Sequence, residues 1–430
     1  MRRVILQERQ QIHPFNEPAR DLRVQNKPLW LWQRDILARY TLEEREYPDW
    51  DLAQRFDGDE HVETIVHRDN LFFNDLLVEE FIERGRAGGQ AVRLAFRADD
   101  PAIAAHVRPL TRSFHTQGEL LLADMWYLPN GISESVAAAP LVIDTEALER
   151  GYYHIPPYMA SEFGDLLYQL PRKSFMIIES WVHLFFADIL FGVFARGVNI
   201  EDRINRDWRY KIRILLRSLL EQKAVLESSE LVQIGRNVNI DPSARIHGPT
   251  LIGDNVSIGA GTVIDNCIIG SNVTISQGCQ LMLSVVGDGC FLPFRASLFM
   301  TSLMENTMVA QNTCLQLCLV GRDTFIGAGT TFTDFNILPA PLRALINGRL
   351  EMTDLLVLGG CVGHHCRLSS GLILHPARTV ESDVVLLASE DNHIITDNVR
   401  WEDSDHFRYE DRYPYPRLYP RREEKERERV

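Results

Sequence analysis

Aliphatic side chains recur at every sixth position through much of the second half of this 430-residue chain. An α-helix repeats every 3.6 residues and a β-strand every 2, so neither requires a spacing of six. A three-sided solenoid does, because each flat side takes six residues and turns one aliphatic side chain into a shared interior. The series comprises Ile234, Ile240, Ile246, Ile252, Ile258, Ile264, Ile269, Ile275, Leu281, Val320, Ile326, Phe332, Leu356, Val362, Leu368, Leu374 and Val380. It predicts stacked three-sided coils of parallel strands over residues 231–390.

This pattern resembles the hexapeptide-repeat, all-β left-handed parallel β-helix. The period breaks in the segment 335–353, which contains Pro339, Pro341 and the pair Asn347-Gly348. These residues favour turns, so we expect a loop extruded from one corner of the coil. The loop either lines a cleft between neighbouring subunits or is a tolerated surface insertion.

The first 165 residues have a different sequence pattern, in which short apolar runs alternate with amphipathic segments. Such alternation is typical of an α/β sheet of Rossmann-like construction. We expect strands at 4–6, 61–66, 90–96 and 119–127, and helices at 27–37 and 75–87. The predicted domains are an α/β domain at 1–165, a helical connector at 166–230, the β-helix at 231–390 and a charged, aromatic tail at 391–430, which we expect to be extended.

Charge and hydropathy limit the binding partners and the cellular compartment that we expect for this protein. The net charge of −14 makes the whole molecule a poor ligand for nucleic acid. The most apolar stretch, Phe175 to Ala195, is interrupted by Glu179, His183 and Asp188, so it predicts a buried helix and no membrane span. The apolar run at the N-terminus ends too early for a signal peptide. We therefore expect a cytoplasmic protein.

The seven cysteines all lie beyond residue 260, and their number is odd. A disulfide framework is not expected in a large chain without a secretory signal. The run Cys361-Val-Gly-His-His-Cys366 invites a metal-site interpretation. Its spacing is not that of the common zinc sites, and the six-residue period accounts for it better.

Asp69 directly follows an apolar strand in the first domain. Acidic residues at the carboxyl edge of such sheets meet nucleotides and their Mg²⁺; taken alone, the same residue is also a common helix cap. The stretch from Ile65 to Asn74 and the helix after it resemble the metal-binding strand and helix of sugar-phosphate nucleotidyltransferases. Lys27-Pro28-Leu29 is similar to their Lys-Pro motif, and 14–23 looks like the altered N-terminal loop of one branch.

The order of domains matches the bifunctional N-acetylglucosamine-1-phosphate uridylyltransferase/glucosamine-1-phosphate acetyltransferase family. The resemblance implies that Asp69 holds Mg²⁺, that Lys27 neutralises the sugar phosphate and that Arg23 contacts the nucleoside triphosphate. Asp188 is the implied second metal ligand, and its alternative interpretation is a carboxylate on a mostly buried helix.

The loop after the first strand departs from the family. Residues 7–13 contain no glycine, although backbone N–H groups must approach a triphosphate closely there. Glu8 would repel phosphate, and Arg9 would partly compensate by binding it. Nucleotidyl transfer is therefore expected to be weakened, altered in substrate or lost.

The acetyltransferase signature is also incomplete. The segment Gly327 to Thr330 matches the family, but Gln311 stands where the resemblance implies a histidine base. Glutamine has no pKa near working pH and cannot replace it. Three other histidines are candidate bases, since a neutral imidazole in a cleft deprotonates an amine or hydroxyl. They are His364, His365 and His375, and each also fits a turn or a coil surface.

Together these features predict a transferase: a nucleotidyltransferase-like domain fused to an acyltransferase-type β-helix, acting in nucleotide-sugar or cell-envelope glycan metabolism. The implied ligands are a nucleoside triphosphate, a sugar phosphate, Mg²⁺ and an acyl-CoA. Hexapeptide solenoids usually form homotrimers, which we expect here. The alternatives are a catalytically decayed trimeric scaffold that binds a nucleotide sugar, and an acyltransferase whose first domain only recognises the acceptor.

Overall fold

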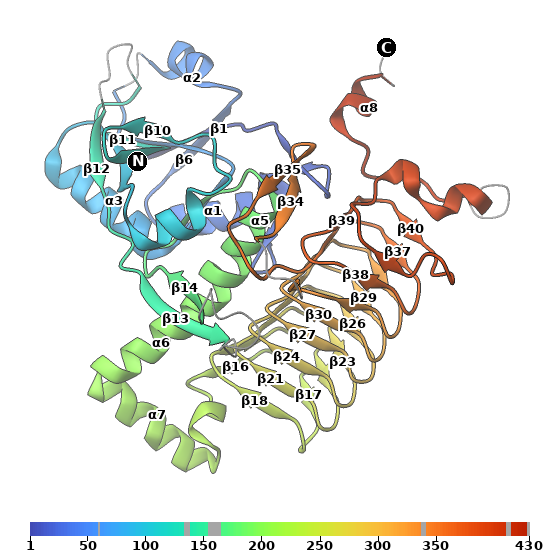
Figure 1. Ribbon diagram of the computed structural model, residues 1–430. Coiled ribbons are helices and arrows are strands. Elements are labelled where there is room, and N and C mark those ends of the chain that lie inside the picture. The colour runs from blue at the N-terminus through green and yellow to red at the C-terminus, as the bar shows by residue number, and fades with distance from the viewer. Residues whose placement is uncertain (59–60, 133–137, 154–164, 337–340, 410–413, 428–430) are drawn as a thin grey trace. The chain divides into compact units, whose positions relative to one another are not determined.

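The computed structural model describes residues 1–430 except 59–60, 133–137, 154–164, 337–340, 410–413 and 428–430 (Figure 1). Its contacts group the chain into two compact units. The first unit contains residues 1–10 and 18–179, and the second contains 11–17 and 180–430. The short segment Gln11–Glu17 therefore belongs with the β-helix, although it lies near the start of the chain.

The first unit is built on a mixed β-sheet. Its strands run in the order β12-β9-β11-β7-β1-β6, with β10 paired to β11. β1 is parallel to both of its neighbours, and β11 is antiparallel to β7 and β9. The strands are β1 (Arg2–Leu6), β6 (Glu43–Tyr47), β7 (Thr64–Arg68), β9 (Val92–Arg97), β10 (His115–Gln117), β11 (Leu120–Leu128) and β12 (Ala139–Val142). The structure confirms the α/β class, because helices alternate with these strands.

Those helices are short and amphipathic. α3 begins after Asn74, whose side chain accepts a hydrogen bond from the N–H of Leu77, and buries Leu77, Val78, Phe81 and Ile82. The described helices of this unit are η1 (Ala19–Asp21), α1 (Leu29–Leu37), α2 (Trp50–Asp57), α3 (Asp75–Gly88) and η2 (Ile103–Val107). Small strands complete the unit: β4 (Arg23–Val24), β5 (Lys27–Pro28), β8 (Leu71–Phe73), β13 (Leu148–Tyr153), β14 (Leu166–Leu170) and β15 (Phe175–Ile177). β2 (Gln11–Ile12) and β3 (Glu17–Pro18) lie in the loop before them.

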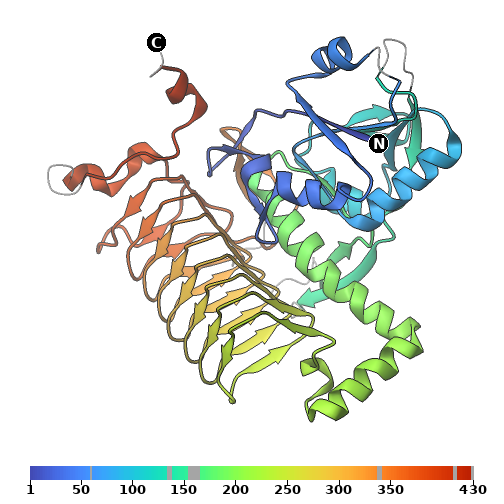
Figure 2. The ribbon, with the colours of Figure 1, turned by 180° about the vertical axis from the view of Figure 1, so that it is seen from behind.

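The β-helix of the second unit has three parallel sheets, each with eight strands among the described residues (Figures 1 and 2). The first sheet holds β16 (Val232–Ile234), β19 (Thr250–Ile252), β22 (Ile268–Ile269), β25 (Val285–Val286), β28 (Ser302–Leu303), β31 (Leu319–Val320), β36 (Cys361–Val362) and β39 (Thr379–Val380). The second holds β17 (Asn239–Ile240), β20 (Ser257–Ile258), β23 (Thr274–Ile275), β26 (Phe291–Leu292), β29 (Met308–Val309), β32 (Phe325–Ile326), β37 (Arg367–Leu368) and β40 (Val385–Leu386). The third holds β18 (Arg245–His247), β21 (Val263–Asp265), β24 (Gln280–Met282), β27 (Ser297–Phe299), β30 (Cys314–Gln316), β33 (Thr331–Phe332), β38 (Ile373–Leu374) and β41 (Ile394–Ile395).

The aliphatic series fills the interior of these coils, as predicted. Its members from Ile246 onward stack in one buried core except Leu356, which is only partly buried and lies outside this core. Ile234 at the open first coil is 46% exposed. The slip in the period has a backbone cause. Asn266, Leu283, Met300 and Leu317 all have φ near +50°, and each turns a tight corner after a strand of the third sheet. The side ending at such a corner is one residue shorter, so the coils from β19 to β31 repeat every 17 residues.

A long helix precedes the coils. It consists of α5 (Trp181–Phe185), the wider-wound η3 (Phe186–Phe194) and α6 (Ala195–Arg206). It passes a length and hydropathy test for a membrane span, yet 83% of its most apolar window is buried inside the protein. Arg196 donates to the carbonyl of Pro249, so the helix packs along the β-helix as a core element. The predicted buried helix is confirmed from Trp181, while 175–177 form a strand.

The remaining elements of this unit are peripheral. α7 (Trp208–Glu221) and η4 (Val225–Glu227) lead into the first coil. The segment 335–353 carries a hairpin of β34 (Arg343–Ile346) and β35 (Arg349–Met352), and its residues 337–340 lie outside the described part. The tail forms η5 (Trp401–Asp403), η6 (Asp405–Tyr409) and α8 (Arg422–Arg427). The domain boundaries expected at 165, 230 and 390 stay a prediction.

Candidate functional site

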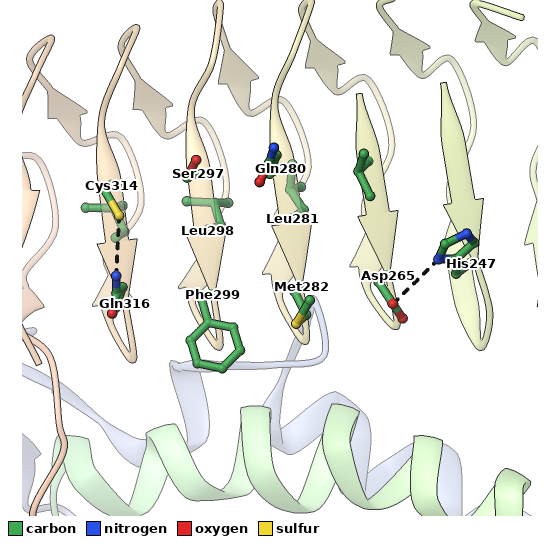
Figure 3. A pocket seen from close by; sticks show the side chains of 12 residues that line it. His247, Asp265, Gln280, Leu281, Met282, Ser297, Leu298, Phe299, Cys314 and Gln316 are labelled. Atoms are coloured by element: carbon green, nitrogen blue, oxygen red, sulfur yellow. Dashed lines mark hydrogen bonds and ion pairs between the residues drawn. The ribbon is translucent and has the colours of Figure 1, made fainter. Parts of the chain in front are cut away.

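A groove of about 350 Å³ runs along the outer surface of the third sheet (Figure 3). Each strand here turns its middle residue inward and its first and third residues outward. The parallel register stacks the outward residues of successive coils into two rows. One row is Val263, Gln280, Ser297 and Cys314, and the other is His247, Asp265, Met282, Phe299 and Gln316.

His247 and Asp265 lie at the start of the second row. The imidazole Nδ1 of His247 is 3.6 Å from a carboxylate oxygen of Asp265, and its Nε2 is 3.9 Å from Glu227. Arg245 shares that Glu227 oxygen through a hydrogen bond of 3.2 Å. The His247 side chain is one-third exposed, so solvent and ligand both reach it. An imidazole beside a carboxylate is the arrangement of a general base with its orienting group.

The groove continues as an apolar wall. Met282 and Phe299 project side by side from neighbouring strands, next to the His247–Asp265 pair (Figure 3). Gln280 and Ser297 add hydrogen-bonding groups along the first row. An apolar wall with a few polar groups is typical of small-molecule sites. The arrangement can hold an extended, mostly apolar chain with its reactive end near His247.

In the first unit, Asp69 lies directly after β7 and is buried. One of its oxygens accepts the N–H of Glu8 at 2.8 Å, and the other lies 3.1 Å from the guanidinium of Arg20. Burial raises the pKa of Asp69 to about 6, against the lowering effects of the Glu8 N–H and of Arg20. Arg20 also pairs with Glu46, so one guanidinium links two carboxylates.

The three predicted substrate-binding residues of this unit do not contact Asp69 through any interaction of the described side chains. Lys27 pairs with Asp35 at 2.6 Å, and Arg9 donates to Gln7. Arg23 donates to the carbonyl of Asp21. Their role in binding phosphate stays a prediction.

Mg²⁺ does not fit this arrangement well. Both Asp69 oxygens have donors already, and one of these donors is a cation. Within the described residues there is no group of three His, Cys, Asp or Glu side chains placed to hold a metal. Asp188, the second predicted ligand, belongs to the other unit, where it is buried in η3 and accepts a 2.6 Å hydrogen bond from Ser302. That contact fastens the long helix to β28.

His364 is fully buried at the last coils of the β-helix. Its Nδ1 accepts the N–H of Arg322 at 3.0 Å, and its Nε2 faces Glu17 at 3.3 Å. Its ring lies between those of Phe15 and Tyr419, with centroids 5.0 and 4.7 Å away. Burial lowers the pKa of His364, and Glu17 partly opposes this effect. The ring is enclosed and its Nδ1 is occupied by the Arg322 N–H, which suits a structural histidine better than a base for a bound substrate.

The other two candidate bases lie nearby in the chain but in different surroundings. His365 has φ of +54°, lies 3.0 Å from Asp383 and stacks on Tyr415 with centroids 4.5 Å apart. His375 is half-buried in the turn after β38. Neither histidine lines the groove on the third sheet. Catalysis by His364, His365 or His375 stays a prediction.

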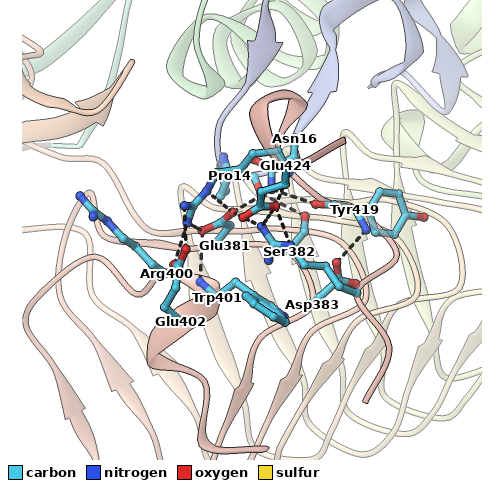
Figure 4. A network of polar contacts seen from close by, with 12 residues as sticks. Pro14, Asn16, Glu381, Ser382, Asp383, Arg400, Trp401, Glu402, Tyr419 and Glu424 are labelled. Atoms are coloured by element: carbon cyan, nitrogen blue, oxygen red, sulfur yellow. Dashed lines mark hydrogen bonds and ion pairs between the residues drawn. The ribbon is translucent and has the colours of Figure 1, made fainter. Parts of the chain in front are cut away.

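A buried polar network joins the first and last parts of the second unit at the same coils (Figure 4). Glu381 accepts hydrogen bonds from Asn16 at 2.9 Å and from Arg417 and Arg421 at 3.2 and 2.8 Å. Ser382 donates to the carbonyl of Pro14. The tail is therefore ordered over its described residues and docks on its own β-helix.

Sequence reasoning did not single out His247, Asp265, Arg20 or Glu381. His247 and Asp265 could have been found from the sequence, because they are 18 positions apart, which is one full coil of the predicted β-helix. Arg20 and Glu381 had no such signal, since their partners come from distant parts of the chain.

Comparison with known proteins supports the fold. A family model described as bacterial transferase hexapeptide (six repeats) matches residues 232–266. The chain is 24% identical over 154 residues to the bifunctional protein GlmU of Synechococcus elongatus, covering 32% of this chain and 33% of that protein. It is 23% identical over 260 residues to GlmU of Xylella fastidiosa, covering 57% and 54%. The matches thus span between a third and about half of these relatives' lengths.

Solved structures give only distant matches. The UDP-N-acetylglucosamine O-acyltransferase LpxA of Moraxella catarrhalis shares 15% identity over 36% of this chain and 68% of its own, with a TM-score of 0.22. The polysialic acid O-acetyltransferase OatWY shares 19% identity over 39% and 80%, with a TM-score of 0.17. The three parallel sheets and the family match show that the chain carries a hexapeptide-repeat β-helix, and its sequence is similar to the GlmU proteins.

Proposed function

We propose that the β-helix is an acyltransferase that moves an acyl group from coenzyme A to an amine or hydroxyl of a phosphorylated or nucleotide-linked sugar. The observation that carries the proposal is the groove on the third sheet, where an imidazole that is one-third exposed lies beside a carboxylate at one end of an apolar wall. The similarity to GlmU and the hexapeptide match support the same class of reaction.

His247 would act as the general base. It removes the proton from the acceptor nitrogen or oxygen as that atom attacks the thioester carbonyl. The C–S bond then breaks, and the thiolate of coenzyme A leaves and takes up a proton from the imidazolium. Asp265 would hold the ring and stabilise its positive charge at that stage. Met282 and Phe299 would cover the apolar arm of the donor.

The proposed reaction also fits an expected compartment and oligomeric state. All seven cysteines are free thiols, which suits a reducing compartment such as the cytoplasm, where acyl-CoA is available. In a homotrimer, a neighbouring subunit would cover the open groove of each β-helix and complete the site.

The test is thiol release from acetyl-CoA with a panel of amino sugars, sugar phosphates and nucleotide sugars. We expect His247→Ala to lower kcat/KM by about 100-fold and Asp265→Asn by about 10-fold. His393→Ala, which removes an exposed histidine elsewhere on the β-helix, is the matched control and should leave the rate unchanged. No turnover by the unaltered protein with any acceptor would overturn the proposal. Loss of activity in His364→Ala, His365→Ala or His375→Ala alone would move the base to that residue.

A second candidate function is nucleotidyl transfer by the first unit, with Asp69 at the site. The position of Asp69 after β7 and the similarity to GlmU favour it, and the Arg20 pairing opposes it. The test is pyrophosphate release from nucleoside triphosphates and hexose 1-phosphates. A rate no higher than that of Asp69→Ala would leave this unit a role in recognising the acceptor. If neither assay shows turnover, the protein is a scaffold.

A further inference from the structure

Helix α7 carries an apolar stripe on its outer side. Trp208, Ile212, Leu215, Leu216, Leu219 and Leu220 are each between 44% and 79% exposed. Their spacing puts them along one face, because residues at i, i+4, i+7, i+8 and i+11 align on an α-helix. The helix is held by its other face, where Ile214 and Ser218 are buried. The side chains of the stripe therefore do not take part in packing α7 against the unit.

Positive charge borders this stripe. Between residues 203 and 223 there are seven Lys and Arg residues and two acidic residues, a net charge of +5 in a chain of net charge −14. On the helical wheel Lys211 flanks one edge of the stripe, and Arg209 and Arg213 flank the other. Arg213 pairs with Glu230, whereas no carboxylate pairs with Arg209 or Lys211 among the described side chains. Two cations thus remain for an external anion.

We propose that α7 binds the surface of an anionic lipid bilayer. A helix with exposed leucines and a tryptophan on one face and lysines and arginines at its borders lies in the headgroup region, where the apolar face reaches the acyl chains. The basic residues meet lipid phosphates and carboxylates at the same depth. The acidic remainder of the chain is repelled by such a surface, so α7 is the element that faces it.

A second copy of this chain is a poorer occupant. In a twofold dimer closed through this face, equivalent residues of the two copies approach one another. The basic borders would then face basic borders, at a Coulombic cost that an anionic bilayer does not impose.

The experiment is co-sedimentation of the full chain with vesicles of phosphatidylcholine, with and without 30% phosphatidylserine. We expect binding to the anionic vesicles that weakens at least tenfold between 50 and 500 mM NaCl. Ten millimolar inorganic phosphate should not compete, which separates a lipid surface from a phosphate site. The fluorescence of Trp208, taken as the difference from Trp208→Phe, should shift to shorter wavelength on binding.

Variants separate the alternatives. The double change Leu216→Ser and Leu219→Ser, and the double change Arg209→Glu and Lys211→Glu, should each weaken binding at least tenfold. All four side chains are exposed, so thermal unfolding reports whether the fold is kept. Leu350→Ser, which removes a leucine of similar exposure on β35, is the matched control. Equal binding to neutral vesicles, or variants that change only the oligomeric mass in light scattering, would overturn the proposal.

Discussion

The carboxylate of Glu381 is fully buried, and the guanidinium of Arg421 donates to both of its oxygens. Arg417 and Asn16 bind the same carboxylate. Burial alone would raise the pKa of Glu381, but these hydrogen bonds outweigh it and bring the pKa down to about 2. One side chain on the last coils therefore holds both the segment 11–17 and the tail.

Replacing Glu381 should destabilise the second unit. Glu381→Ala leaves two guanidinium groups without their buried partner, so we expect a loss of about 3 kcal/mol in the free energy of unfolding. Chemical denaturation of the full chain measures it. The control is Glu402→Ala, which removes the half-exposed carboxylate on the other side of Arg421 and should cost less than about 1 kcal/mol. Equal losses from the two variants would contradict the central role of Glu381.

Glu381 should also make the protein sensitive to acid. Its folded pKa lies below the unfolded value, so its stabilisation is present above about pH 4.5 and is lost as the pH falls toward 2. The difference in unfolding free energy between the unaltered chain and Glu381→Gln should therefore shrink over this range. A difference that stays constant from pH 6 to pH 3 would show that the charge is not what stabilises the network.

Asp69 should have the opposite pH dependence. Its folded pKa of about 6 is above the unfolded value, so the stability linked to it is full below about pH 4 and is lost as the pH rises through 6. Asp69→Asn should remove this slope and gain about 2 kcal/mol relative to the unaltered chain between pH 4 and pH 7. Urea unfolding at a series of pH values measures it. A parallel pH profile for the two proteins would contradict the raised pKa.

Removing the arginine beside Asp69 should open the site to a cation. Arg20→Ala leaves Asp69 and Glu46 without their shared guanidinium, and two carboxylates are a suitable pair for Mg²⁺. We expect 10 mM Mg²⁺ to raise the Tm of Arg20→Ala by several degrees and that of the unaltered chain by less. The double variant Arg20→Ala with Asp69→Asn is the control. The same shift in all three proteins would show that Mg²⁺ acts elsewhere.

The apolar wall of the groove should matter for donor binding. Phe299→Ala removes a ring beside the proposed path of the donor, so KM for acyl-CoA should rise by about tenfold with little change in kcat. Phe291→Ala, which removes a partly exposed ring from the second sheet, should change neither constant. If the two variants behave alike, the donor does not lie along this row.

The period of six was sufficient to predict the β-helix, because burial of one aliphatic residue per side is a local and repeated requirement. It did not predict the tight corners, because positions such as Leu283 and Met300 adopt φ > 0 without being glycine. The same period could have identified the His247–Asp265 pair, which is one coil apart. Predicting it needed attention to the outward positions of each side as well as the inward ones.

Two other parts of the structure could not be predicted this way. The Arg20–Asp69 pair and the Glu381 network join residues 49 and 36 or more positions apart in sequence, with no repeat that sets their register. The tail lacks periodicity, yet Tyr415 and Tyr419 dock on His365 and His364. Such contacts depend on tertiary structure that the local pattern does not encode.

The placement of Gln11–Glu17 on the last coils has a consequence for how the chain is made. Glu381, Ser382 and Arg322, which bind this segment, are synthesised more than 300 residues after it. Domains generally fold as the N-terminal part emerges. Here the segment must wait without its partners until the last coils have been synthesised, so its docking follows the synthesis of the β-helix.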